Sequence, residues 1–171
     1  CDAKHFIEGL DQMCDDGLPN YAQWVSWCQD IGSRYPAYTP SEPGDLLHPY
    51  ALVDHVFRQL RHDDIVVCGN ASACILPFQV GHLNAGQRMF SNSGAASMGY
   101  DLPAAIGAAT ASRGRRVICF AGDGSLQMNL QELQTLKTLG LDLVVVVIDN
   151  GGYLSIRQTH ENFFDRVVSA T

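Results

Sequence analysis

Two features that the sequence lacks exclude whole classes of function. Basic residues are scarce, because 11 lysines and arginines stand against 18 aspartates and glutamates, for a formal net charge of −7. No basic surface is therefore expected for the phosphates of nucleic acid or for an anionic bilayer. The longest apolar run, Leu143–Ile148, is far shorter than the roughly 20 residues that a membrane-spanning helix needs. We predict that neither nucleic acid nor a membrane is a partner.

The sequence also lacks a C-x-x-C pair, although it has six cysteines. Two of them, Cys68 and Cys119, fall in apolar stretches that are typical of buried strands. We predict reduced thiols in a cytoplasmic protein. A disulfide framework is the alternative, but a chain of this length can build a core without one. The first five residues lack the basic start and apolar centre of a signal peptide, so nothing predicts export.

A proline-rich segment divides the chain. Residues Tyr35–Asp45 contain three prolines and one glycine, so they cannot continue a helix or a central strand. Before them, apolar residues from Tyr21 to Arg34 fall at spacings that place one stripe on a helix. We predict that residues 1–38 are the tail of a preceding domain with a linker helix, and that residues 39–171 form a second domain.

Helical and strand patterns alternate after the linker. In chain order we expect a helix over His48–Arg61, a strand over Ile65–Cys68, a helix from Pro103, a strand over Val117–Ala121, a helix from Asn129 to Gly140, and a strand over Leu143–Ile148. Continuous apolar strands predict an α/β fold in which a parallel sheet has helices on both faces. Ligands bind such sheets at the carboxyl ends of the strands. The loops of interest are Gly69–Cys74, Gly122–Asn129 and Asp149–Arg157.

Three residues are expected to mark helix ends. Pro103 suits the first helical position, where a missing N–H has no cost. Asn129 can cap a helix, with Glu132 three residues later completing a capping box. Gly140 suits the left-handed position that ends a helix.

The motif Gly122-Asp123-Gly124-Ser125 lies between an expected strand and an expected helix. Its glycines let the backbone approach a ligand closely, and the free N–H groups of a helix start attract an anion. Asp123 would repel that anion unless a cation lay between them, and Mg²⁺ takes oxygen ligands from carboxylate, amide and phosphate together. By itself the motif is equally typical of an ordinary turn. The hypothesis is a site for a diphosphate and Mg²⁺.

The loop after the next strand offers the remaining metal ligands. Asn150 can supply an amide oxygen, and the adjacent Gly151 and Gly152 allow a backbone carbonyl to turn inward. We predict Asp123, Asn150 and Gly152 as the metal ligands.

The spacing of these motifs resembles a known signature. Gly122-Asp123-Gly124 is followed by 25 residues and then Asn150, which is similar to the motif of thiamine diphosphate-dependent enzymes of the acetolactate synthase and pyruvate decarboxylase group. The resemblance runs from about Leu46 to Phe164 and concerns their C-terminal, diphosphate-binding domain. It implies the thiamine diphosphate-binding fold, incomplete at its C-terminus, with residues 1–38 as the tail of the middle domain. The chain is therefore expected to be a fragment or part of a longer subunit.

Two further segments resemble cofactor-binding stretches of that family. Ser93–Gly107 is similar to the aminopyrimidine segment, which implies that the Ala96 carbonyl accepts a hydrogen bond from the cofactor and that Met98 supports its bent form. For Met98 an ordinary core position is the alternative. Asn70–Ala73 resembles the loop that binds the terminal phosphate through Ser72, although an ordinary polar loop fits equally well. The implied cofactor-binding residues are Asn70, Ala71, Ser72, Ala96, Ser97, Met98, Gly122, Asp123, Gly124, Ser125, Asn150, Gly152, Tyr153 and Leu154.

The resemblance also implies a reaction. In this family thiamine diphosphate is the electron sink while a 2-keto acid, usually pyruvate, loses carbon dioxide, and the acyl carbanion is transferred to a carbonyl acceptor or protonated. We expect an acetolactate synthase-like transferase or lyase that uses thiamine diphosphate and Mg²⁺, with FAD a further candidate in the full-length protein. A simple 2-keto acid decarboxylase and a non-catalytic cofactor-binding module are the alternatives.

In the family, the glutamate that activates the cofactor belongs to another domain and comes from the partner subunit. This implies no catalytic residue in this chain, no activity of the chain alone, and a homodimer or homotetramer with the active site at the subunit interface. The sequence departs from acetolactate synthases proper where Thr159 replaces the tryptophan of their N-N-x-x-L-G-M-V-x-Q-W motif. This argues against branched-chain amino-acid synthesis. Nearby, Arg157 could hold an anionic acceptor or lie on a solvated face.

Overall fold

The computed structural model describes residues 2–15, 19–39, 47–112, 114–164 and 166–167, so Cys1 and residues 40–45 of the predicted linker lie outside it. The chain separates into two compact units, Cys1–Thr39 and Pro40–Thr171. The first unit contains helices α1 (Ala3–Asp15) and α2 (Ala22–Arg34). Helix α2 begins one residue after the predicted start, whereas helix α1 was not predicted. That this unit is the tail of a middle domain stays a prediction.

The second unit is built on a four-stranded parallel sheet. In spatial order the strands are β2 (Arg88–Phe90), β1 (Ile65–Cys68), β3 (Val117–Gly122) and β4 (Leu143–Ile148). All three neighbouring pairs are parallel, with Ile65 opposite Val117 and Val117 opposite Leu143 in the register. Because the strands run in one direction, all their carboxyl ends lie at one edge of the sheet. The predicted parallel sheet is confirmed.

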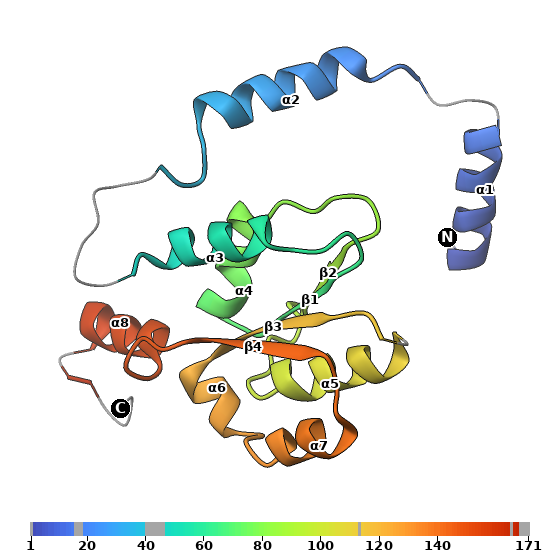
Figure 1. The fold of residues 1–171 in the computed structure, drawn as a ribbon. Coiled ribbons are helices and arrows are strands. Elements are labelled where there is room, and N and C mark those ends of the chain that lie inside the picture. Colours follow the sequence, from blue (N-terminus) through green and yellow to red (C-terminus); the bar gives the residue numbers. More distant parts are fainter. Residues whose placement is uncertain (1, 16–18, 40–46, 113, 165, 168–171) are drawn as a thin grey trace. The chain divides into compact units, whose positions relative to one another are not determined.

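Helices cover both faces of this sheet. The helices of this unit are α3 (Pro49–Arg58), α4 (Ser72–Val80), α5 (Asp101–Ala111), α6 (Asp123–Gln127), α7 (Glu132–Leu139) and α8 (Leu154–Phe163). Figure 1 shows α3 and α4 on one face, with α5, α6 and α7 on the other. The predicted arrangement of helices on both faces is therefore confirmed. No helix in the described part of the chain is long and apolar enough to cross a membrane.

The core lies on the two central strands. Every residue of β1 is buried, and so are the apolar residues of β3; Ala105 and Ala109 of α5 pack against them. Both predicted strand cysteines lie in this core, and burial raises the pKa of the Cys68 thiol to about 12. Cys14, Cys28, Cys68, Cys74 and Cys119 are all free of disulfides.

Three of the predicted helix boundaries are wrong. The helix expected over His48–Arg61 ends at Arg58. α5 begins at Asp101, so Pro103 is its third residue and not its first. Asn129 does not cap α7: the residue before that helix is Gln131, and the Asn129 side chain instead donates a hydrogen bond to the carbonyl of Gly99 at 2.6 Å. A contact between distant segments has replaced the local cap. Gly140 does end α7, with a left-handed φ of 60°, as predicted.

A buried ion pair lies at the amino-terminal edge of the sheet. Asp64 directly precedes β1 and is fully buried, and Arg116 directly precedes β3. The Arg116 guanidinium donates to both carboxylate oxygens of Asp64, and the N–H of Arg61 donates to Oδ2 at 2.7 Å. Burial raises the pKa of Asp64, but these donors and the charge of Arg116 outweigh it and hold the pKa below its usual value.

Candidate functional site

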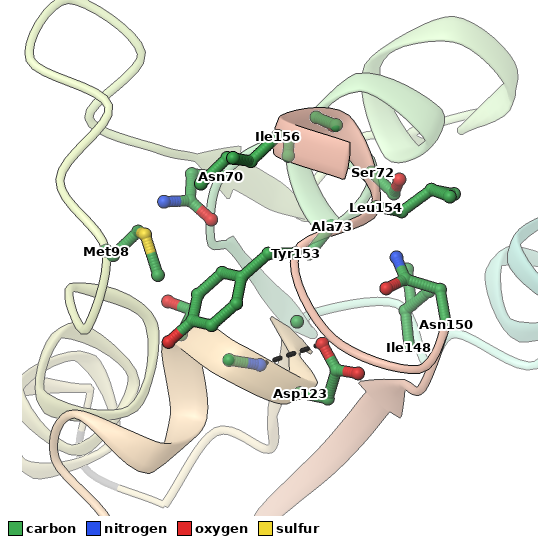
Figure 2. Close-up of a pocket in the computed structure, with 15 residues that line it drawn as sticks. Asn70, Ser72, Ala73, Met98, Asp123, Ile148, Asn150, Tyr153, Leu154 and Ile156 are labelled. Carbon is green, nitrogen blue, oxygen red and sulfur yellow. Dashed lines mark hydrogen bonds between the residues drawn. The ribbon is translucent and has the colours of Figure 1, made fainter. Parts of the chain in front are cut away.

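A pocket of about 100 Å³ lies at the carboxyl edge of the sheet. The loops after β1, β3 and β4 form it together with Met98, and Figure 2 shows Met98 and Asn150 on opposite sides of the Tyr153 ring. Its lining is Asn70, Ala71, Ser72, Ala73, Met98, Gly122, Asp123, Gly124, Ser125, Ile148, Asn150, Tyr153, Leu154, Ser155 and Ile156. Three loops that are far apart in sequence thus converge where ligands bind in parallel α/β folds.

Asp123 is the acidic residue of this pocket. It begins α6, and its two carboxylate oxygens accept hydrogen bonds from the backbone N–H groups of Gly124, at 2.8 Å, and Gly152, at 2.7 Å. Burial raises the pKa of Asp123, but hydrogen bonds from the N–H groups of Gly152, Gly124 and Asn150 and with the Asp149 side chain more than offset it, so the pKa lies below its usual value. Among the described residues, no basic side chain forms an ion pair with Asp123. The pocket therefore contains an ionised carboxylate whose charge no cation balances.

The side chain of Asn150 supplies a second oxygen that could bind a cation. Its Oδ1 is buried and has no hydrogen-bond partner, which in a native structure calls for a bound water or ion. Its backbone carbonyl accepts a hydrogen bond from the Arg157 guanidinium at 2.9 Å. Arg157 is partly buried and does not belong to the pocket lining. It holds the Asn150 loop.

These oxygens fit Mg²⁺ better than a softer metal. The described residues contain no cluster of three or more His, Cys, Asp or Glu side chains that could hold a metal. Mg²⁺ does not need such a cluster, because it commonly uses one or two protein oxygens and completes its shell with phosphate oxygens and water. Each oxygen of Asp123 keeps a second lone pair beside its hydrogen bond. Asp123 and Asn150 therefore suit a magnesium ion that also binds phosphate.

The backbone at this edge of the sheet is unusually strained. Among the described residues, three that are not glycine have positive φ: Ala71 at 46°, Ala96 at 49° and Tyr153 at 41°. All three belong to the predicted cofactor-binding set, and such conformations cluster at functional sites, where surrounding contacts hold them. One such contact is the hydrogen bond from Asn70 Nδ2 to the Ala96 carbonyl, at 3.3 Å.

The Tyr153 ring explains why residue 124 is a glycine. A Cβ atom at Gly124 would lie 2.5 Å from Cε1 of Tyr153. The ring thus packs directly on the Gly122–Ser125 turn, and any side chain at position 124 would displace it.

The structure places most of the predicted site residues around this one pocket. Ala96, Ser97 and Gly152 do not line it: Ser97 is exposed, and Gly152 contacts the site through Asp123. Four lining residues were not predicted, namely Ala73, Ile148, Ser155 and Ile156. Three of them are apolar; Ile148 is the last residue of β4, and the other residues lie in the first turns of α4 and α8. Strand-end position alone could have identified them.

Comparison with known proteins agrees with this geometry. Residues 70–171 match the family described as "Thiamine pyrophosphate enzyme, C-terminal TPP binding domain". The "Acetolactate synthase large subunit" of Cyanidium caldarium is 44% identical over 169 residues, which is 96% of this chain and 28% of that protein. The corresponding subunit of Parasynechococcus marenigrum is 36% identical over 154 residues, 90% of this chain and 24% of that protein.

The chain thus spans about a quarter of the length of these relatives. Among solved structures, benzoylformate decarboxylase from Polynucleobacter necessarius has a TM-score of 0.69 and 24% identity, over 80% of this chain and 26% of that chain. At that identity the likeness establishes the fold. Because the family match covers more than half of the sequence, the chain belongs to the thiamine pyrophosphate, or thiamine diphosphate, enzymes, and residues 70–171 represent their C-terminal cofactor-binding domain.

Proposed function

We propose that this chain binds thiamine diphosphate and Mg²⁺ in an enzyme that decarboxylates a 2-keto acid, pyruvate in particular, and transfers the acyl group to a carbonyl acceptor. The observation that carries the proposal is the pairing of an ionised Asp123, which no cation balances, with the unpartnered Oδ1 of Asn150 in one pocket. A divalent cation would satisfy both oxygens, and the diphosphate would complete its coordination.

Different residues of the chain would contact the metal, the diphosphate and the pyrimidine of the cofactor. Asp123 and Asn150 would hold the metal, the turn Gly122–Ser125 would lie along the diphosphate, and Met98 would contact the pyrimidine end. The bound cofactor would supply the electron sink for decarboxylation. The apolar contacts of Tyr153 and Ile148 would exclude water from the metal, which strengthens charged interactions in the site.

The relatives named acetolactate synthase support a carboligase, in which a second carbonyl compound accepts the acyl group. Thr159, which stands where those enzymes' motif has tryptophan, is exposed, and its hydroxyl donates to the Ser155 carbonyl within α8. A simple decarboxylase would differ by forming its product from the keto acid alone. The dependence of product on an added carbonyl acceptor separates the two.

Other features of the complete protein are part of the same proposal. It would be a cytoplasmic homodimer or homotetramer whose partner subunit supplies the activating glutamate, and FAD binding would belong to residues outside this chain. On this view the 171-residue chain has no turnover alone, because it contains no base for the cofactor.

Calorimetric titration of thiamine diphosphate into the intact protein tests the proposal. Asp123→Ala should weaken binding in the presence of Mg²⁺ by about 100-fold, roughly 2.7 kcal/mol, because the diphosphate loses its bridge to the protein. Removing Mg²⁺ from the wild type should have the same effect, and the two losses should not add. Asp142→Ala removes the same charge from an exposed carboxylate near the opposite edge of the sheet, so it should leave affinity unchanged. Unchanged affinity in Asp123→Ala would reject the metal site.

A further inference from the structure

Asp101 joins three of the loops at the carboxyl edge of the sheet. It is the first residue of α5 and is fully buried, and it does not line the pocket. Its Oδ1 accepts the N–H of Leu102 at 2.9 Å, and its Oδ2 accepts the hydroxyl proton of Ser125 at 2.7 Å. The loop after β1 packs against the same carboxyl, since a Cβ at Gly69 would lie 2.6 Å from Oδ2.

Ser125 extends this connection to the loop that carries Met98. The Ser125 side chain is buried, and its Oγ accepts the backbone N–H of Gly99 at 2.8 Å. A hydroxyl has one proton to donate, and that proton is already directed to Asp101. While this bond persists, only the backbone of Ser125 can donate to a ligand.

Gly99 is held from its other side as well. Its carbonyl accepts a hydrogen bond from Asn129 Nδ2 at 2.6 Å. Its φ is +78°, and a Cβ there would lie 2.8 Å from Nδ2 of Asn129. The residue next to Met98 is therefore fixed by two side chains of the segment that follows Asp123.

We propose that Asp101 is a positioning residue that acts through the Ser125 hydroxyl to fix Gly99, and so sets Met98 relative to the Asp123 loop. This inference rests on the proposed function, in which Met98 and Asp123 contact opposite ends of one cofactor. The link is short: Met98 is adjacent to Gly99, and Asp123 lies two residues before Ser125. The lock formed by Asp101, Ser125, Gly99 and Asn129 thus presets the distance between the two ends of the binding site.

The same geometry argues against a role for Asp101 as a general base. Both of its carboxylate oxygens are engaged by donors of the chain, and a base must reach the proton that it removes. Asp101 has no access to the pocket, so its effect on the reaction must pass through Ser125 and Gly99.

Two substitutions break the lock with little change of shape. Asp101→Asn leaves one acceptor oxygen where the carboxylate had two, so either Leu102 or Ser125 loses its partner. Ser125→Ala removes the link itself and is available if Asp101→Asn does not fold. Ile106→Val is the control, because Ile106 is a buried residue of the same helix that takes part in none of these hydrogen bonds.

The experiment combines amide hydrogen exchange of residues 94–100 with cofactor calorimetry and steady-state kinetics on the intact protein. In both lock variants, exchange of this segment should rise by about tenfold or more, with and without cofactor, because Gly99 loses its restraint. Affinity for thiamine diphosphate should stay within about threefold, while kcat falls by about tenfold at unchanged KM, since misplacement affects the reacting geometry. Ile106→Val should leave all three measurements near the wild-type values.

Unchanged exchange in both variants would overturn the proposal. So would a loss of cofactor affinity as large as the loss of kcat, because that would assign the effect to phosphate binding by Ser125. If the wild type itself does not bind thiamine diphosphate, the proposed function fails. Hydrogen exchange without cofactor still reports on the lock in that case, so the two failures are distinguishable.

Discussion

Asp64 and Asp123 are carboxylates at opposite edges of the same sheet, and both have a pKa below its usual value for different reasons. At the amino-terminal edge, the Arg116 guanidinium balances the charge of Asp64. At the carboxyl edge, backbone N–H groups and the side chain of Asp149 contact Asp123, and none of these groups carries a positive charge. Dipoles stabilise a charge without cancelling it. The amino-terminal edge is the closed edge, because its charge is balanced within the protein. The carboxyl edge is the open edge, because the charge of Asp123 can still attract a cation.

Strained backbone is also found at the carboxyl edge, around the pocket. The positive-φ residues Ala71, Ala96 and Tyr153 all lie in loops around the pocket. At the other edge, the side chain of Arg115 donates to the backbone carbonyls of Asp63, at 2.6 Å, and Gly86, at 2.8 Å. One edge of the domain therefore stabilises the fold, while the other keeps strained backbone and unsatisfied polar atoms for binding.

The largest expected effect is on stability and comes from the closed edge. Arg116→Met should destabilise the protein by about 3–5 kcal/mol, because it leaves the buried Asp64 carboxylate without its cation. Asp123→Asn, measured without Mg²⁺ and cofactor, should cost only about 1 kcal/mol, since no ion pair is broken. Thermal unfolding of both variants checks the difference.

The response to ligand sharpens this test. Mg²⁺ with thiamine diphosphate should raise the melting temperature of Arg116→Met as much as that of the wild type, because ligand that binds only the folded state stabilises it by mass action. The same addition should have little effect on Asp123→Asn. Equal destabilisation by the two variants in the absence of ligand would refute the division between a closed and an open edge.

A smaller effect is expected at the other end of the pocket. Met98→Ala should lower turnover by about tenfold and change cofactor affinity less, because Met98 shapes the reactive geometry while metal and phosphate contacts provide most of the binding. Met89→Ala, on β2 and outside the pocket, is the control for lost apolar contacts. Equal losses of turnover and affinity in Met98→Ala, with a lower melting temperature, would indicate that Met98 is only a core residue.

The central fold was predictable because its signals are local and strong. Continuous apolar runs identified β1, β3 and β4, and Gly140 identified the end of α7. Helix α4 escaped prediction because Pro77 lies inside it and removes one backbone donor. Helix α8 was not predicted either: its apolar residues Leu154, Ile156 and Phe163 are few, and none of its residues is buried.

The site shows the same limit of sequence analysis. The spacing of Asp123 and Asn150 predicted that they would meet at one edge, and they do. The lock around Gly99 could not be predicted, because it depends on side chains from distant segments. Asn129 is the clearest example: its local sequence suits a helix cap, but its amide binds the Gly99 carbonyl 30 residues away.

The smallest expected effect is a pH dependence shared by the two carboxylates. The usual pKa of an aspartate is 3.8, and both Asp64 and Asp123 have a lower value in the folded protein. A group whose folded pKa is depressed contributes stability above its unfolded pKa and loses that contribution as the pH falls through the folded pKa. Between pH 7 and pH 5 both groups are ionised in the folded and unfolded states, so neither should alter the melting temperature in this range.

Below about pH 4 the contributions of Asp64 and Asp123 to the stability of the wild type should disappear. The two edges should then differ in how they respond to Arg116→Met and to added Mg²⁺. The difference in melting temperature between the wild type and Arg116→Met should begin to shrink above this pH, because burial without the Arg116 cation raises the pKa of Asp64 in the variant and a neutral carboxyl no longer needs a cation. Added Mg²⁺ should not change this difference, since Asp64 is closed to ions. When thiamine diphosphate is present, added Mg²⁺ should lower the pH at which the stabilising effect of Asp123 is lost, because a bound cation opposes protonation of its ligand. A series of unfolding curves from pH 7 to pH 3, with and without both ligands, measures each shift. A response of the Arg116→Met difference to Mg²⁺ would contradict the assignment of the closed edge.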